Sequence, residues 1–264
     1  MKQMLTLPSN DKLNVLITRP EKKARSLATS ITSLNITCTE QPLFDYLPLA
    51  GYDISEHLLT SADIMIFVSV AAVEFAHAVV DAKRWHCQHI VAVGQTTKVA
   101  LTQLGFSHVL CPNMENSEGL LRLPVLSANI RSKNITIVRG NGGREHLASQ
   151  LRECGAHVNY LESYQRVWRA FSKDISKQWF EQQINCIVVT SNVILEKLIE
   201  LTVKQPEQDT MQPLISYWRT QCLWLVASQR IADQAKHCGC KHVIISEGAS
   251  DQAITDTLRQ LDNQ

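Results

Sequence analysis

The sequence repeats itself, and this internal repeat constrains the fold more than any other feature of the chain. Three segments of the first half return, in the same order, in the second half. The pairs are residues 14–20 and 134–140, 62–69 and 184–191, and 91–97 and 225–230. Each match is weak on its own, but the shared order indicates that the chain consists of two similar halves.

Each half contains about five short apolar runs that are rich in β-branched residues, with helical periodicity between them. The runs centre near Val15, Ile36, Ile66, Val91 and Val109, and then near Ile135, Val158, Val188, Leu225 and Val243. Apolar strands that alternate with helices are typical of a parallel sheet covered on both faces. The sequence therefore predicts an α/β protein of two similar domains, each a five-stranded parallel sheet flanked by helices.

Composition limits the partners of such a protein. The chain has 264 residues, enough for about two domains. With 26 Lys and Arg against 25 Asp and Glu the formal charge is +1, so overall charge attracts neither nucleic acid nor an anionic membrane. The sequence has no apolar run near the roughly 20 residues of a membrane span and no signal-peptide pattern. We expect a cytoplasmic protein whose partner is a small molecule.

Eight cysteines are scattered along the chain, and one segment, residues 237–242 (His-Cys-Gly-Cys-Lys-His), has the composition of a metal site. The repeat offers a different interpretation. Residues 104–109 and 154–158 hold equivalent positions, with a glycine that ends a helix before the next strand begins. In the repeat, Phe106 is equivalent to Cys240, so a metal is not required to explain the cysteine. We therefore predict no metal site.

Ligands of open parallel sheets bind at the carboxyl ends of the strands. The functional residues are therefore expected directly after the strands, at Thr18, Arg19, Ser69, residues 94–97, residues 139–144, Thr190, Ser191 and residues 228–230. Because the chain has almost no net charge, an anionic ligand would have to be bound there by local groups.

Residues 139–144, Arg-Gly-Asn-Gly-Gly-Arg, form the sharpest of these signals. Glycines between a strand and a helix allow a ligand close to the backbone, and the free N–H groups of the helix start attract an anion. Arg139 and Arg144 could each pair with a carboxylate or a phosphate. The segment lacks the third glycine of a dinucleotide fingerprint, although Glu162 stands about 20 residues on, where a ribose-binding acid is expected. A dinucleotide-dependent enzyme that uses the Gly140 loop and a tight turn with solvated arginines both stay open.

Four hydroxyl residues, Ser69, Thr97, Ser191 and Ser228, stand at junctions between a strand and a helix. Capping the helix is the ordinary role of such residues. Their recurrence in both halves also fits a two-sided cleft lined by hydroxyl and N–H groups. They are not accompanied by a Ser-His-Asp, Cys-His or paired-acid pattern, so no nucleophile is predicted.

Tyr164 leaves a strand and enters a polar stretch, and an offset of 120 residues places Phe44 at the equivalent position. Both segments follow the second strand of their half, and we interpret them as connectors between the domains. A tyrosine beside a cleft donates or accepts a proton, and a packed linker aromatic is the alternative.

Taken together, these segments resemble the uroporphyrinogen-III synthase family, in particular its gammaproteobacterial members. The resemblance rests on residues 16–20, 67–69, 91–97, 116–121, 139–144 and 164–166, which follow in order over nearly the whole chain. It implies two α/β domains joined by two extended strands, with a first domain built from both ends of the chain. On this basis domain 1 is placed at residues 1–41 and 170–264, domain 2 at 49–163, and the linkers at 42–48 and 164–169.

Members of the family convert hydroxymethylbilane, a linear tetrapyrrole with eight carboxylates, into uroporphyrinogen III for haem biosynthesis. The reaction expels water, inverts ring D and closes the macrocycle, so the resemblance implies a cyclising lyase. It implies no cofactor, and we expect a monomer that binds neither nucleic acid nor a membrane. Positioning of the substrate by a few N–H groups, hydroxyls and arginines suits this reaction.

The resemblance also implies roles for individual residues. Tyr164 matches the tyrosine proposed to assist departure of the hydroxyl group. The expected contacts with the substrate are Arg19, Ser69, Thr97, Arg139, Gly140, Gly142, Ser191, Ser228 and Arg230. Residues 227–230 depart from the Gly-x-x-Thr of the family, so Ser228 and Arg230 are only substitutes for the family threonine. A noncatalytic module that binds a tetrapyrrole or another anion is therefore a further alternative.

Overall fold

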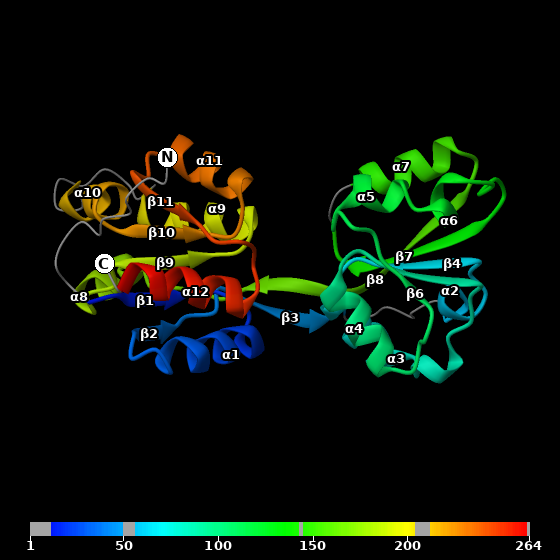
Figure 1. Ribbon diagram of the computed structural model, residues 1–264, viewed down its shortest axis with the longest axis horizontal. Coiled ribbons are helices and arrows are strands. Elements are labelled where there is room, and N and C mark those ends of the chain that lie inside the picture. The colour runs from blue at the N-terminus through cyan, green and yellow to red at the C-terminus, as the bar shows by residue number, and fades with distance from the viewer. Residues whose placement is uncertain (1–11, 50–55, 143–144, 204–211, 263–264) are drawn as a thin grey trace. The chain divides into compact units, whose positions relative to one another are not determined.

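A computed structural model describes residues 12–49, 56–142, 145–203 and 212–262 of the protein. The chain divides into two compact units (Figure 1). Unit 1 is Met1–Asp45 with Trp168–Gln264, and unit 2 is Tyr46–Val167. The two ends of the chain therefore share one unit. The linkers placed at residues 42–48 and 164–169 stay a prediction.

The sheet of unit 1 contains five parallel strands in the order β11-β10-β9-β1-β2. They are β1 (Asn14–Ile17), β2 (Thr37–Glu40), β9 (Cys186–Val189), β10 (Leu223–Val226) and β11 (His242–Ile245). Strand β1 lies between β2 and β9, so the beginning of the chain completes a sheet that is otherwise built from its end. The predicted α/β class and parallel sheet are confirmed.

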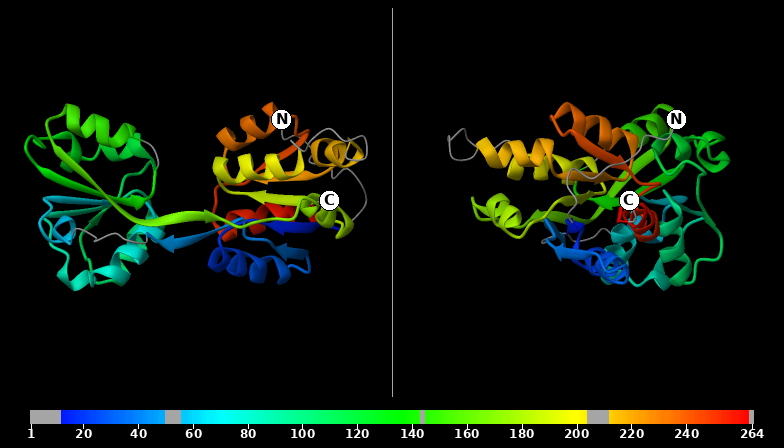
Figure 2. Two further views of the ribbon diagram at one scale, coloured as in Figure 1. Left: turned by 180° about the vertical axis from the view of Figure 1, so that it is seen from behind. Right: turned by 60° about the vertical axis from the view of Figure 1, so that its left-hand side comes forward.

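Helices cover both faces of this sheet (Figures 1 and 2). They are α1 (Glu21–Thr32), α8 (Ile175–Glu181), α9 (Asn192–Thr202), α10 (Gln212–Thr220), α11 (Gln229–His237) and α12 (Asp251–Asp262). Helices α1 and α12 pack together on Ile17, Val188 and Leu225. Helices α9 and α11 lie side by side on the other face. Burial on both faces explains why the three central strands, β1, β9 and β10, are continuous apolar runs.

The sheet of unit 2 contains six strands in the order β3-β8-β7-β4-β5-β6. They are β3 (Phe44–Pro48), β4 (Ile64–Phe67), β5 (His89–Ala92), β6 (Val109–Leu110), β7 (Asn134–Gly140) and β8 (His157–Trp168). The prediction of five strands is wrong here by one. The additional strand, β3, lies within residues 42–48, the segment predicted to connect the domains. Strand β3 lies beside β8 on the edge opposite to β7, where it supplies partners for backbone groups of β8 that would otherwise lack them.

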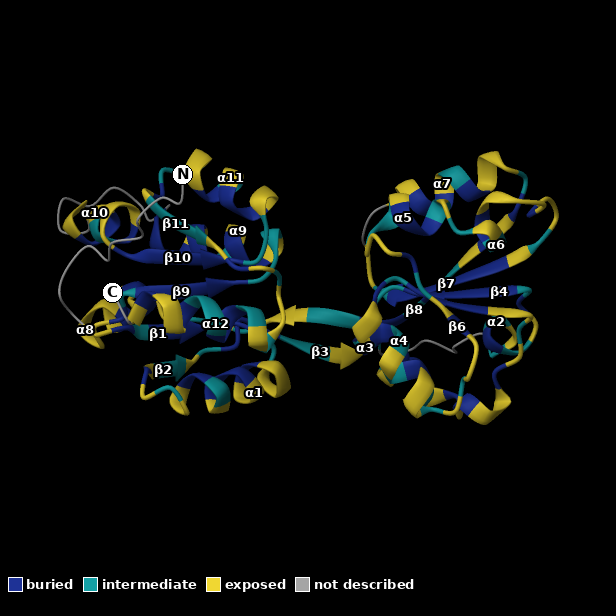
Figure 3. Ribbon diagram, in the orientation of Figure 1, coloured by how far each residue is buried: buried dark blue, intermediate teal, exposed yellow. Residues whose placement is uncertain are grey.

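Two groups of helices cover the faces of the second sheet. They are α3 (Val70–Val79) and α4 (Gln95–Gln103) on one face, and α5 (Ser117–Leu121), α6 (Pro124–Ser127) and α7 (His146–Glu153) on the other. The first face, called the α3 face, buries Phe67 and Val138, and the second, called the α7 face, buries Ile66 and Ile137. Figure 3 shows the buried strands between helices whose outer sides are exposed. A short helix, α2 (His57–Thr60), precedes β4.

Three helices end at the glycines that the repeat predicts. Gly105, Gly155 and Gly239 have φ values of 99°, 87° and 93°, a region that glycine adopts without strain. Cys240 follows the last of them and is 2% exposed, and burial raises the pKa of its thiol to about 12. In the described part of the chain, no three His, Cys, Asp or Glu side chains are grouped so that they could hold a metal ion. None of its helices is both long and apolar enough to cross a membrane.

Candidate active site

Three of the predicted hydroxyls cap the helices that follow their strands. Ser69 Oγ accepts a hydrogen bond from the Ala72 N–H at 3.0 Å, at the start of α3. Ser191 and Ser228 cap α9 and α11 in the same way, at 3.3 and 3.5 Å. Each cap uses an oxygen lone pair and leaves the hydroxyl proton for another acceptor. Capping and ligand binding are therefore compatible at these positions.

Tyr164, on β8, is 8% exposed and belongs to the α3 face. Its ring meets the ring of Tyr46 edge-on, with centroids 4.8 Å apart, and lies 5.5 Å from the ring of Phe75. Its phenolic oxygen lies 3.1 Å from Ser69 Oγ. The structure thus brings together Tyr164 and Ser69, which are 95 residues apart in the sequence.

The contact between Tyr164 and Ser69 allows two arrangements of protons. Since Ser69 Oγ already accepts the Ala72 N–H, its own proton can be donated to the phenolic oxygen. Alternatively, its second lone pair can accept the phenolic proton. In the first arrangement the O–H of Tyr164 is free for a ligand, which is what a general acid requires.

The Gly140 loop approaches Tyr164 closely. A Cβ atom at Gly140 would lie 2.6 Å from the nearest atom of the Tyr164 ring, so only glycine fits beside this ring. Gly142 has a φ of 68°, and its N–H donates to Glu162 Oε1 at 3.1 Å. Beside Gly140 the close neighbour is thus a side chain of the protein, whereas a Cβ atom at Gly142 would meet nothing within 4 Å. That a ligand approaches the backbone of these glycines stays a prediction. Arg144, the last predicted residue of this loop, lies outside the described residues.

Arg139, at the end of β7, is 8% exposed and already has acidic partners. Its guanidinium donates to Glu145 Oε1 and to Glu162 Oε1, both at 3.1 Å. Burial alone would lower the pKa of Arg139, but these two hydrogen bonds outweigh it and raise the pKa. Sequence reasoning missed Glu145, because an acid beside a loop is not distinctive in a sequence.

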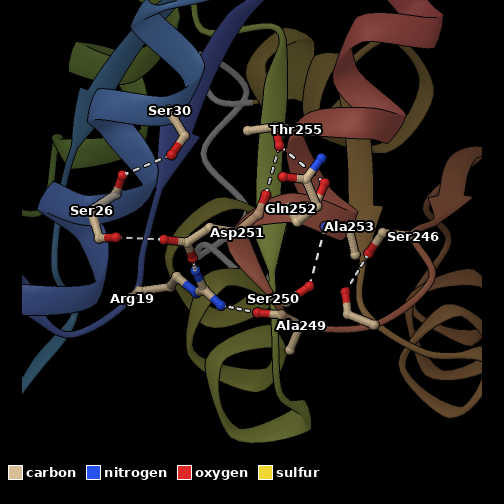
Figure 4. A network of polar contacts seen from close by, with 11 residues as sticks. Arg19, Ser26, Ser30, Ser246, Ala249, Ser250, Asp251, Gln252, Ala253 and Thr255 are labelled. Carbon is tan, nitrogen blue, oxygen red and sulfur yellow. Dashed lines mark hydrogen bonds and ion pairs between the residues drawn. The ribbon is translucent and has the colours of Figure 1, made fainter. Parts of the chain in front are cut away.

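Arg19, at the end of β1, is also paired within its own unit (Figure 4). Its guanidinium contacts the Asp251 carboxylate and the carbonyl oxygen of Ala249, and it is 5% exposed. Ser26 in α1 donates to the other oxygen of Asp251 at 2.6 Å. This network joins β1, α1 and the first turn of α12. No local pattern in the sequence indicates that Arg19 reaches this turn.

Thr97 lies in the first turn of α4 and is 2% exposed. The backbone N–H of Gln95, also in this turn, donates to Glu115 Oε1 at 2.8 Å. A carboxylate of the protein therefore occupies the position at which a helix start attracts an anion. No pattern in the sequence indicates Glu115, since the contact spans 20 residues.

Arg230, in the first turn of α11, differs from the other two arginines. It is exposed, and in the described part of the chain no carboxylate lies within ion-pair distance of it. It follows Ser228, the cap of the same helix, by two positions. Of the three arginines predicted to bind the substrate, Arg19 and Arg139 are paired with carboxylates of the protein, and Arg230 has no such pair among the described residues.

Comparison with known families identifies the family of the chain. The family model described as Uroporphyrinogen-III synthase HemD matches residues 25–256. The chain belongs to the uroporphyrinogen-III synthase family. This confirms the resemblance that the sequence segments indicate.

Relatives of the family are similar to the chain over almost its whole length. Uroporphyrinogen-III synthase of Salmonella typhimurium (strain LT2) is 32% identical, with 94% of this chain and all of that protein covered. The Escherichia coli (strain K12) synthase is 29% identical over the same shares. Among solved structures, a mutant synthase of the extremely thermophilic bacterium Thermus thermophilus has a TM-score of 0.64 at 14% identity, covering 96% of this chain and all of that one. The structure of the Helicobacter pylori 26695 synthase has a TM-score of 0.59 at 12% identity, covering 95% of this chain and all of that one.

Membership of the uroporphyrinogen-III synthase family disfavours the dinucleotide-dependent enzyme as an alternative. The structure agrees at the residue on which that alternative depends. Glu162 was a candidate for binding a ribose, but its Oε1 accepts hydrogen bonds from Arg139 and from the Gly142 N–H. The carboxylate of Glu162 thus binds the Gly140 loop of the protein itself.

Proposed function

We propose that the chain is a cyclising lyase that converts hydroxymethylbilane to uroporphyrinogen III, with Tyr164 as the proton donor. One observation carries the role of Tyr164: its phenolic oxygen lies 3.1 Å from Ser69 Oγ at the start of α3. Family membership supports the reaction, and the buried ring of Tyr164 supports a fixed direction for its proton. Neither a nucleophile nor a pair of acids is needed for this chemistry.

The proton is required when the terminal hydroxyl group leaves. The phenolic O–H donates its proton to that oxygen, the C–O bond breaks with its electron pair on oxygen, and water departs. The adjacent pyrrole nitrogen stabilises the cation that remains on carbon, and the substituted carbon of ring D attacks it to give a spiro intermediate. The bond from this carbon to the methylene of ring C then breaks, the methylene bonds to the unsubstituted α-carbon of ring D, and the proton of that carbon is released, which balances the proton donated to the leaving water. Ser69 supports the donor, because its own proton can bond to the phenolic oxygen while the charge develops.

Hydroxyl and N–H groups at helix starts, together with Arg230, are proposed to bind the carboxylates of the substrate. The proposed contacts are Ser69, Thr97, Gly140, Gly142, Ser191, Ser228 and Arg230. Arg19 and Arg139 would join them only by exchanging an internal acid for a substrate carboxylate. We propose no cofactor, and a monomer in the cytoplasm, where the eight free cysteines stay reduced.

Product analysis tests the reaction. The purified chain is incubated with hydroxymethylbilane, the products are oxidised, and the type I and type III isomers are separated. A synthase yields an excess of type III over the control without protein. A product mixture equal to that control, with saturable binding of the tetrapyrrole, would instead indicate the noncatalytic binding module, for which the departure at residues 227–230 is the motivating feature.

A further inference from the structure

Side chains along β8 alternate between the two faces of the sheet as far as residue 162. Tyr160 packs on the α7 face and Leu161 on the α3 face. Glu162 continues the alternation, since it bonds to Arg139, whose guanidinium lies over the ring of Tyr160. In a regular strand the alternation would place Tyr164 on the α7 face as well.

Tyr164 lies on the α3 face instead, because β8 contains one extra residue at this point. Arg139 of β7 pairs with Glu162, but the next residue, Gly140, pairs with Tyr164. Ser163 is therefore the extra residue of a β-bulge. A bulge of this kind lets two successive side chains point to one face of a sheet, and so redirects the side chains that follow.

The side chain of Ser163 fastens the bulge. Ser163 is 2% exposed, and its Oγ lies 3.3 Å from the carbonyl oxygen of Ala72 and 3.4 Å from that of Arg139. Ala72 is in α3 and Arg139 is in β7, so one hydroxyl proton links the helix, the neighbouring strand and the bulge. The same α3 carries Ser69 as its cap.

We propose that the bulge at Ser163 aims the Tyr164 phenol at Ser69, which makes Ser163 a positioning residue for the reaction. The proposal rests on the proposed function of Tyr164 as the proton donor. In a regular ladder of the same sequence, the phenol would lie on the α7 face beside Glu162, across the sheet from Ser69. The bulge therefore decides whether the donor and its partner meet.

A matched pair of variants isolates the hydroxyl of Ser163. Ser163→Thr keeps it, whereas Ser163→Val replaces it with a methyl group of similar size, so both variants carry the same added bulk. We expect kcat of Ser163→Val to be about tenfold lower than that of Ser163→Thr, because small displacements of a reacting group cost this much or more. KM should differ less than about twofold between them. If Ser163→Val does not fold, Ser163→Ala is compared with wild type instead.

Fluorine NMR reports the position of Tyr164 without relying on activity. The chain has five tyrosines, and in protein labelled with 3-fluorotyrosine the signal absent from Tyr164→Phe identifies residue 164. We expect this signal to move in Ser163→Val in the same direction as in Ser69→Gly, which removes the partner of the phenol. In Ser163→Thr it should stay near its wild-type position.

The outcomes separate this inference from the proposed function. Equal kcat values in Ser163→Thr and Ser163→Val, with an unmoved fluorine signal, would overturn the positioning role even if Tyr164→Phe is inactive. Wild-type turnover of Tyr164→Phe would instead remove Tyr164 from the mechanism. In that case the fluorine signal alone still decides whether Ser163 holds the phenol in place.

Discussion

The guanidinium of Arg139 lies over the ring of Tyr160, with its Cζ atom 3.6 Å from the ring centroid. The phenol of Tyr160 in turn donates to Glu145 Oε2 at 2.6 Å, and Glu145 also pairs with Arg139. These side chains connect β7, β8 and the start of α7. Their contacts lie on the α7 face of the sheet, whereas Tyr164 lies on the opposite, α3 face.

Replacement of Arg139 by alanine should therefore lower stability and not only substrate affinity. The change leaves the carboxylates of Glu145 and Glu162 without their shared cation. Glu145 is exposed and Glu162 partly buried, so we expect the free energy of unfolding, measured by urea denaturation, to fall by about 1 to 3 kcal/mol. The control is Arg25→Ala, which removes an exposed ion pair with Glu21 and should cost no more than about 0.5 kcal/mol. Equal losses of stability in the two variants would show that the network around Arg139 contributes nothing beyond an exposed ion pair.

Ser69→Gly separates the cap of α3 from the partner of Tyr164. Glycine is a tolerated cap, so the free energy of unfolding should fall by only a few tenths of a kcal/mol. The phenol loses its hydrogen-bond partner, and we expect kcat to fall about tenfold. Ser228→Gly, the same change at the cap of α11, should raise KM and leave kcat nearly unaltered. A kcat effect of equal size in both variants would argue for a general loss of structure.

Arg230→Ala tests whether the exposed arginine of α11 binds a carboxylate of the substrate. The side chain is exposed, so we expect stability to be unchanged and KM to rise about three- to tenfold. Lys236→Ala removes one positive charge from the far end of the same helix and serves as the control. A KM as low as that of the control would leave Arg230 as a solvated surface residue.

Asp45 and Arg169 form an ion pair whose contribution depends on pH. Hydrogen bonds from Arg169 hold the pKa of Asp45 below its ordinary value of 3.8. A carboxyl group whose pKa is lowered by folding stabilises the folded state at a pH above its ordinary pKa. This stabilisation disappears as the pH falls through the pKa of the folded state. At neutral pH, Asp45→Asn should therefore lower the free energy of unfolding by less than about 1 kcal/mol, because the ion pair is partly exposed. In urea titrations its difference from wild type should vanish as pH falls below the folded pKa, and a constant difference would argue against the ion pair.

Features that depend on neighbouring residues in the chain were predictable. The ten apolar runs lie at or beside strands of the two sheets, and Gly105, Gly155 and Gly239 end helices as the repeat predicts. The caps Ser69 and Ser228 follow from the same reasoning. In each case the residue type satisfies a local backbone requirement, so the sequence pattern and the structure agree.

Features that depend on partners far along the chain were not predictable. The acidic partner of Arg19 is Asp251, which lies 232 residues away, and no local pattern indicates such a pair. That Arg19 binds the substrate stays a prediction. The bulge at Ser163 is likewise not indicated by any local pattern. It is defined by the register between β7 and β8, whereas alternation within β8 alone would have put Tyr164 on the wrong face.

Turnover of Tyr164→Phe tests the central claim most directly. The substitution removes one oxygen from a ring that is otherwise held by Tyr46, Phe75 and Gly140, so the protein should stay folded, with an unchanged thermal midpoint. We predict that kcat for formation of uroporphyrinogen III from hydroxymethylbilane falls at least about tenfold while KM stays within about twofold. A kcat equal to that of wild type would contradict the assignment of Tyr164 as the proton donor.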